Sequence, residues 1–312
     1  MLKRQLPLFP SQPDDPKDIN RKTPLGATFD LFRAYLGQEG KSEHTVKAFL
    51  ADMTLLAEHT GAETPVAQYT TTNLNEFLHW MEFGRGVPCS RKTYARRVTS
   101  IKVYFKWLKQ IGAIPHDPAQ AVLQRSGPAP LSQVISREEE KSAILVAQGM
   151  KKGDDHDYRP EFLLLLLLET GIKKSEAGRL TAQDFDRSNP ERPVVLIKHK
   201  SKNVYKERRI EVSARLVEVL DDYLAQYHPK EAVFTCTTRN LEYILTDIGE
   251  QAEIPFKLSF EVMRWTCAVR DYRAGMEEEA IREKLGLSRT SWYETSAKIK
   301  RLSTQLDEQA VH

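Results

Sequence analysis

Apolar residues recur at helical spacing through the first third of the chain. Between residues 90 and 110 they follow one another at steps of four, three, four and three, as Tyr94, Val98, Ile101, Phe105 and Leu108. Residues at such steps share one face of a helix and leave the other face to polar side chains. The same spacing predicts three earlier helices: one around residues 32–36, one that begins after Ser42, and one that begins near Asn73.

A different pattern begins after a stretch rich in proline and glycine, which interrupts any helix between residues 113 and 132. Ser136, with a glutamate three residues later, predicts a capping box that opens a helix. The segment 162–169 is apolar nearly all round, which predicts a buried helix. Two β-rich segments, 194–197 and 204–212, flank a basic turn and predict a hairpin.

These patterns predict a mainly α protein with a small antiparallel β-sheet, divided into two domains. The 312 residues fit about two domains of ordinary size. We expect a helical domain over residues 27–112, a linker over 113–135, and a second, α+β domain over 136–303. Residues 1–26, rich in proline and aspartate, are expected to be disordered, and residues 304–312 to form a second tail.

The overall charge does not by itself indicate a partner. The 46 Lys and Arg residues outnumber the 43 Asp and Glu residues slightly, for a net charge of +3. An argument for nucleic acid must therefore depend on where the positive charges lie. The three cysteines form no CxxC pair and no disulfide framework, which favours a reducing cytoplasm. No apolar run approaches the ~20 residues of a membrane span, and no signal peptide is recognised, so we expect no membrane association.

The predicted helix over residues 90–110 carries positive charge beside its apolar stripe and contains no Asp or Glu. Like charges on one helix face repel one another. DNA phosphates would relieve this repulsion and release counterions. A basic face that is merely solvated is the alternative. The residues of this helix that we expect to contact DNA are Arg91, Lys92, Arg96, Lys102, Lys106 and Lys109.

A candidate for chemistry lies near the C-terminus. Arg264 stands in an otherwise apolar and aromatic segment, where an arginine is costly to leave unpaired and therefore favours an anion. Leu285-Gly286-Leu287 follows, and then the pair Trp292-Tyr293. This order resembles the catalytic domain of the tyrosine recombinase (phage integrase) family, which reads H-x-x-R, a helix, L-G-H and a nucleophilic tyrosine. The resemblance implies a reaction that needs no metal and no cofactor, through a covalent 3′-phosphotyrosyl link to DNA.

The first domain resembles the SAM-like core-binding domain of the same family. The resemblance lies in residues 45–49, in the runs 90–98 and 104–108, and in the segment 112–118. It implies a small helical bundle that grips one side of duplex DNA. The linker would then let the two domains close around the duplex.

Several positions that carry the family's chemistry are substituted in this chain. Glu261 and Leu287 stand where the family has its two histidines. In the T-G-I-K-K-S-E frame, Lys173 replaces the first catalytic arginine, and a lysine cannot bind a phosphate with a two-pronged fork. Tyr293 comes three residues before Ser296, the position that matches the family's nucleophile, which is almost one helical turn.

The predicted hairpin resembles the one that carries a general-acid lysine in this family. Lys202 matches that lysine best, and Lys200 is second. With Lys198 and Arg264 they complete the set that we expect to contact DNA from the second domain. A solvated basic hairpin tip is the alternative interpretation.

The N-terminal segment contains a separate motif, Gln5-Leu6-Pro7-Leu8-Phe9. It resembles the short peptide by which bacterial proteins bind the replicative sliding clamp. In that mode Gln5 would contact the rim, while Leu6, Leu8 and Phe9 would fill an apolar groove. The alternative is a tail in which these apolar residues are incidental.

These residues lead to one principal interpretation and three alternatives. We interpret the chain as a double-stranded DNA-binding member of the family that has lost strand cleavage, because each lost donor or acid–base group costs about 10²–10⁴-fold in rate. The alternatives are an active recombinase that uses Tyr293, a helix-turn-helix regulator with its turn in 281–289, and a helical scaffold without a DNA role. We expect a cytoplasmic, nucleoid-associated protein whose segment 297–306 is available for homo-oligomer formation on DNA.

Overall fold

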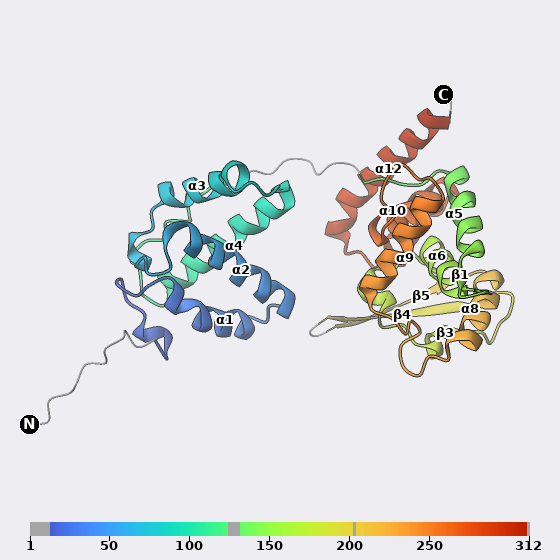
Figure 1. Cartoon of the computed structure of the whole chain (residues 1–312), viewed down its shortest axis with the longest axis horizontal. Coiled ribbons are helices and arrows are strands. Elements are labelled where there is room, and N and C mark those ends of the chain that lie inside the picture. Colours follow the sequence, from blue (N-terminus) through green and yellow to red (C-terminus); the bar gives the residue numbers. More distant parts are fainter. Residues whose placement is uncertain (1–12, 124–131, 202–203, 311–312) are drawn as a thin grey trace, which may run out of the picture. The chain divides into compact units, whose positions relative to one another are not determined.

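The computed structural model describes residues 13–123, 132–201 and 204–310, without the side chains of 199–206 and 309–310. The chain divides into two compact units, Met1–Ala129 and Pro130–His312 (Figure 1). Each unit has its own apolar core. The fold is mainly α with small antiparallel sheets, as the sequence predicts. Over the described ranges, no helix combines the length and the apolar character that crossing a membrane requires.

The first unit is a helical bundle. Its α-helices are α1 (Phe29–Gln38), α2 (Glu43–Thr60), α3 (Thr71–His79) and α4 (Arg91–Gln110), joined by the 3-10 turns Pro16–Asp18, Gly26–Thr28 and Val66–Gln68 and the π-helical turn Trp80–Gly84. Helix α4 begins after Ser90, whose hydroxyl accepts the Thr93 N–H at 3.2 Å. All five members of the predicted apolar stripe on α4 are buried, which confirms the periodicity argument.

Residues on both sides of the predicted first domain also belong to its core. Ile19 and Leu25 are buried, and the Leu25 N–H donates to the Thr64 oxygen at 2.9 Å. The expectation of disorder is therefore wrong for residues 13–26, while residues 1–12 lie outside the described part. On the other side Ile114 and Val122 are buried in the same core, so residues 113–122 pack on the bundle although they were expected to be linker.

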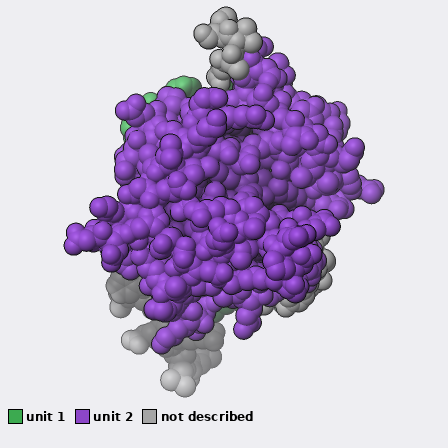
Figure 2. All heavy atoms as spheres, turned by 90° about the vertical axis from the view of Figure 1, so that its right-hand side faces the viewer, with its two compact units in different colours: residues 1–129 green, residues 130–312 purple. Residues whose placement is uncertain are grey.

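The second unit surrounds one buried helix with other helices and a small sheet (Figure 1). Figure 2 shows the surface of this unit in purple. Its helices are α5 (Arg137–Gly149), α6 (Tyr158–Thr170), α7 (Lys174–Ala177), α8 (Ala214–Tyr227), α9 (Thr238–Gln251), α10 (Phe260–Arg273), α11 (Glu278–Lys284) and α12 (Arg289–Ala310). Ser136 opens α5 with the predicted capping box, in which its N–H donates to Glu139 Oε2 at 2.7 Å.

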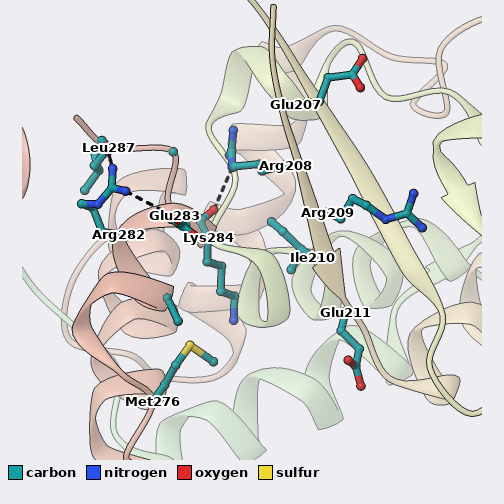
Figure 3. A pocket seen from close by; sticks show the side chains of 12 residues that line it. Glu207, Arg208, Arg209, Ile210, Glu211, Met276, Arg282, Glu283, Lys284 and Leu287 are labelled. Carbon is teal, nitrogen blue, oxygen red and sulfur yellow. Dashed lines mark hydrogen bonds and ion pairs between the residues drawn. The ribbon is translucent and has the colours of Figure 1, made fainter. Parts of the chain in front are cut away.

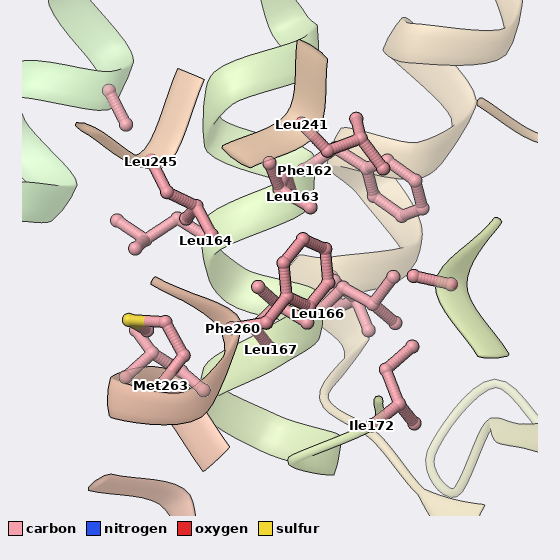
Figure 4. Close-up of a cluster of buried hydrophobic side chains, with 14 of the residues drawn as sticks. Phe162, Leu163, Leu164, Leu166, Leu167, Ile172, Leu241, Leu245, Phe260 and Met263 are labelled. Atoms are coloured by element: carbon pink, nitrogen blue, oxygen red, sulfur yellow. The ribbon is translucent and has the colours of Figure 1, made fainter. Parts of the chain in front are cut away.

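Helix α6 is the centre of this core. It packs against α5, α8, α9 and α10, so an apolar surface on every side has a partner. The leucines at 163, 164, 166 and 167 are buried together with Phe162, Phe260 and Met263 (Figure 4). The prediction of a buried helix in the segment 162–169 is confirmed.

The sheets are short. Strands β1 (Lys151–Lys152) and β2 (Asp155–His156) form one hairpin, and β3 (Phe185–Asp186), β4 (Val194–Ser201) and β5 (Val204–Glu211) form an antiparallel sheet in the order β3-β4-β5. The pairing of Val194 with Glu211 and of Ser201 with Val204 confirms the predicted hairpin.

Helix α7 has only four residues and ends at Gly178, where an added Cβ would meet a methyl carbon of Thr238 at 2.4 Å. The tail expected at 304–312 instead continues α12 through Ala310. The buried side chains of Ile299 and Leu302 attach that helix to the unit.

Candidate functional site

The turn after α6 begins the T-G-I-K-K-S-E motif, in which Lys173 is the fourth residue. Gly171 ends α6 in the left-handed conformation (φ 57°), and its N–H donates to the Leu167 oxygen at 2.9 Å. A Cβ on Gly171 would lie 3.2 Å from Cys267 Sγ, so the turn packs tightly on α10. Lys173 then occupies the N-cap of α7, with its N–H donating to Glu176 Oε2 at 2.8 Å.

Arg264 joins two distant turns. From α10 its guanidinium donates to the main-chain oxygens of Gly171 and Leu285, the latter at 2.6 Å. Burial lowers the pKa of Arg264, and the nearby Glu176 carboxylate opposes this shift. The polar partner that the sequence demands for this arginine is thus supplied by main-chain carbonyls in the structure.

Arg208, on β5, is a site residue that the sequence analysis missed. Its Nη1 and Nη2 lie 3.0 and 2.8 Å from the two oxygens of Glu176, and its Nε donates to the Lys284 oxygen at 2.8 Å (Figure 3). Both side chains of the pair are largely buried. Burial opposes ionisation of Glu176, but the hydrogen bonds from Arg208 outweigh burial, and the pKa of Glu176 is lowered.

A sequence signal for Arg208 did exist. Side chains two residues apart on a strand point to the same face of a sheet. Ile210 is buried, so Arg208 shares its inward face, whereas the neighbouring Arg209 is exposed and pairs with Asp186 at 2.9 Å. The basic character of the whole hairpin concealed this alternation.

Among the described residues, Arg208 pairs with the Glu176 carboxylate, and Lys173 and Arg264 lie near enough to interact with its charge. Lys173 is half-buried, and burial is the main reason that its pKa is lowered; Glu176 opposes the shift, while Arg264 and Arg208 add to it. These mutual effects place the charges of Lys173, Arg208, Arg264 and Glu176 in one neighbourhood. Their formal sum is positive, which suits an anion.

The other residues that the sequence led us to expect at catalytic positions lie in different surroundings. Glu261 is exposed in the first turn of α10. Leu287 is half-buried in an apolar cluster that includes Trp292, and its main-chain oxygen accepts from Arg282 at 2.6 Å. Tyr293 is 82% exposed near the beginning of α12. Its side chain is therefore largely in contact with solvent.

The hairpin lysines can be placed only in part. Lys198 Nζ lies 2.6 Å from Asp184 Oδ1, and this hydrogen bond raises the pKa of Lys198. Asp184 is itself buried, so it holds Lys198 at the base of the hairpin. Lys202 lies outside the described residues, and so does the side chain of Lys200.

The basic residues of α4 divide into two groups. Arg91, Lys92, Lys106 and Lys109 are exposed and Lys102 is half-buried, so this group can reach a ligand. Arg96 instead forms an ion pair with Asp52 of α2 and donates to the Ala48 oxygen at 3.0 Å.

Asp52 is the second residue that the sequence analysis missed. It is 1% exposed, accepts from Ser100 Oγ at 2.7 Å, and has Arg97 Nε at 3.6 Å. Asp52 stands three residues after Phe49 and four before Leu56, so helical spacing places it on the buried face of α2, but the sequence does not show its partners on α4. Gln5, Leu6, Leu8 and Phe9 of the clamp-like motif lie outside the described residues.

Comparison with known proteins adds family and fold. The model of the phage integrase family matches residues 135–298, and the model of the phage integrase N-terminal SAM-like domain matches residues 29–112. Tyrosine recombinase XerC of Mycobacterium sp. (strain KMS) is 29% identical over 166 residues, 53% of this chain and 55% of that protein. XerC of Mycobacterium tuberculosis (strain ATCC 25177 / H37Ra) is 29% identical over 164 residues, 52% of this chain and 54% of that protein. The chain spans about half the length of the curated relatives it matches.

Solved structures share the fold at low identity. A lambda integrase dimer bound to a COC′ core site has a TM-score of 0.69 and 12% identity, over 87% of this chain and 77% of that chain. XerH site-specific recombinase bound to palindromic difH substrate has a TM-score of 0.68 and 18% identity, over 85% of this chain and 78% of that chain. At these identities the likeness establishes the fold alone.

Proposed function

We propose that this chain, which belongs to the phage integrase family, binds double-stranded DNA and does not cleave it. The observation that supports the proposal most strongly is the group of Lys173, Arg208 and Arg264 near the carboxylate of Glu176. A cluster with net positive charge at the T-G-I-K-K-S-E motif favours binding of a phosphate of the DNA backbone. The exposed basic residues of α4 supply further phosphate contacts from the first unit.

Structural relatives support DNA as the partner. The lambda integrase and XerH structures are complexes with DNA, and the lambda integrase is a dimer in that complex. By analogy the present chain assembles on DNA as a homo-oligomer. A cytoplasmic, nucleoid-associated location stays a prediction from the sequence. Binding of a sliding clamp by residues 5–9 stays a prediction from the sequence.

The loss of cleavage follows from the chemistry of the substituted positions. Attack by a tyrosine with an ordinary pKa of about 10 needs a base, and the leaving oxygen needs an acid. Glu261 carries a charge that a phosphate repels, and Leu287 has no hydrogen-bond donor on its side chain. Each such loss costs about 10²–10⁴-fold in rate, and the losses fall on the same reaction.

An active recombinase is the second candidate. It is favoured by the XerC relatives, which are named as tyrosine recombinases. In that case the Tyr293 oxygen attacks a DNA phosphorus after its part of α12 moves. The bond to the 5′ oxygen breaks, that oxygen leaves as a hydroxyl, and the wild-type chain stays joined to the 3′ phosphate.

Charge reversal on α4 tests the DNA-binding proposal. Lys102→Glu with Lys106→Glu should weaken binding of a labelled duplex in a mobility-shift titration and reduce the salt slope by about 2. The matched control is Lys17→Glu with Lys22→Glu, two exposed lysines of the same unit that lie outside α4. The proposal would be refuted if the α4 variant bound the duplex as tightly as the control at every salt concentration.

A further inference from the structure

Two guanidinium groups converge on the end of α11 from different elements. Arg208 of β5 donates to the Lys284 oxygen, and Arg264 of α10 donates to the oxygen of the next residue, Leu285. Arg208 also lies against Gly286, where an added Cβ would be 2.9 Å from Nη1. The two arginines are therefore neighbours at one short stretch of main chain.

At this site Lys173 replaces one expected arginine, and Arg208 brings a guanidinium from a different position. The resemblance to the family implies an arginine at the position of Lys173, and an ammonium group cannot make the paired, planar hydrogen bonds of a guanidinium. Arg208 already demonstrates that geometry, because its two terminal nitrogens contact both oxygens of the Glu176 carboxylate. A phosphate presents two oxygens in a similar arrangement.

Arg208 also borders open space. A cavity of about 840 Å³ lies between β5 and α11, and Arg208, Lys284 and Gly286 are among the residues that line it (Figure 3). An anion therefore has a route to the guanidinium that need not pass through the core. Glu176 occupies two of its nitrogens and Lys284 a third, which leaves the remaining N–H groups of Arg208 for a further acceptor.

We propose that Arg208 supplies the second guanidinium of the phosphate-binding site, in place of the arginine that Lys173 replaces. The phosphate is one of the DNA backbone, so the inference rests on the proposed function. Arg264 and Arg208 bind it together, and Glu176 holds Arg208 in place and offsets part of the charge while the site is empty.

The test compares two variants that differ only at Arg208. Removing Arg208 alone would take away the guanidinium that pairs with the buried Glu176 carboxylate, so the comparison is between Glu176→Gln and the double variant Glu176→Gln with Arg208→Ala. Arg209→Ala is the matched control, because Arg209 is the next residue on the strand and its ion pair is exposed. Circular dichroism and thermal unfolding establish that each variant is folded before binding to a labelled duplex is measured over a range of salt concentrations.

The double variant should bind duplex about tenfold more weakly than Glu176→Gln, with a salt slope smaller by about 1. A third variant, Glu176→Gln with Arg208→Lys, should have the same salt slope as Glu176→Gln but a lower affinity. Lysine restores the positive charge but cannot make the paired hydrogen bonds of a guanidinium. Equal affinity and slope in the first two variants would overturn the inference. A weaker affinity with an unchanged slope would also overturn it, because that result assigns Arg208 a purely structural role. Absence of salt-dependent binding in the wild type would instead refute the proposed function.

Discussion

Arg208 and Arg264 donate hydrogen bonds to the main-chain oxygens of adjacent residues, Lys284 and Leu285, from a strand and a helix far apart in the sequence. Carbonyls at the end of a helix have no partner within that helix. Here two guanidinium groups satisfy them. The turn between α11 and α12 is thereby fixed, and with it the direction in which α12 leaves and the place of Tyr293 on it.

Glu176 should contribute stability that depends on pH. Burial opposes its ionisation, but hydrogen bonds from Arg208 hold its pKa below the ordinary value of 4.5 in the folded state. An acid of this kind stabilises the fold above its unfolded pKa, and the contribution disappears as pH falls through the folded pKa. At neutral pH, Glu176→Gln should lower the free energy of unfolding by about 1–3 kcal/mol, measured with urea. The difference from wild type should shrink as the pH is lowered below 4.5.

Glu211→Gln is the control for that measurement. Glu211 pairs with Arg192 at the exposed end of the hairpin and should leave stability nearly unchanged at neutral pH. A difference between wild type and Glu176→Gln that stays constant across the acid range would contradict the assignment.

Ser100 should matter to the first unit although it lies on a basic helix. Its hydroxyl donates to the buried Asp52 carboxylate at 2.7 Å. Loss of a hydrogen bond to a buried charged group costs about 1.5–3 kcal/mol, so Ser100→Ala should lower the free energy of unfolding by that amount. Thr99→Ala changes the adjacent exposed residue and should stay within about 0.5 kcal/mol of wild type. Similar values for the two variants would mean that Asp52 does not depend on Ser100.

Gly286 should resist substitution for a backbone reason and a packing reason. Its φ of 62° is left-handed, and a Cβ there would lie 2.9 Å from Nη1 of Arg208. Gly286→Ala should destabilise the protein by at least about 1 kcal/mol in thermal or urea unfolding. Gly149→Ala, at the end of α5 with no atom within 4 Å of the added Cβ, should have no such cost. Equal stability of the two variants would show that the turn relaxes freely.

Local patterns predicted those parts of the fold that depend on local physics. The stripe on α4 follows from helical periodicity, the buried α6 from its uniformly apolar sequence, and the hairpin β4–β5 from two β-rich segments around a turn. The burial of Leu25 and Ile114 was not predictable in this way. Each is an apolar residue in a polar or proline-rich context, and only the tertiary fold brings it to the core.

The candidate site was predicted in part for the same reason. Lys173 and Arg264 stand in motifs that extend over several residues, so the sequence marks them. Arg208 and Asp52 owe their environment to contacts with residues more than thirty positions away. Alternation on β5 and helical spacing on α2 mark the two side chains as inward-facing, but their partners become apparent only when those segments are brought together.

Covalent capture on a nicked suicide duplex tests the central claim most directly. Wild-type protein is incubated with the labelled duplex, and one portion is run on a native gel while another is denatured first. Tyr293→Phe is the paired variant, because it removes the phenol oxygen and keeps the ring. We predict retention of the duplex on the native gel by both proteins and no adduct that survives denaturation. An adduct formed by the wild type and absent from Tyr293→Phe would contradict the account and identify an active recombinase.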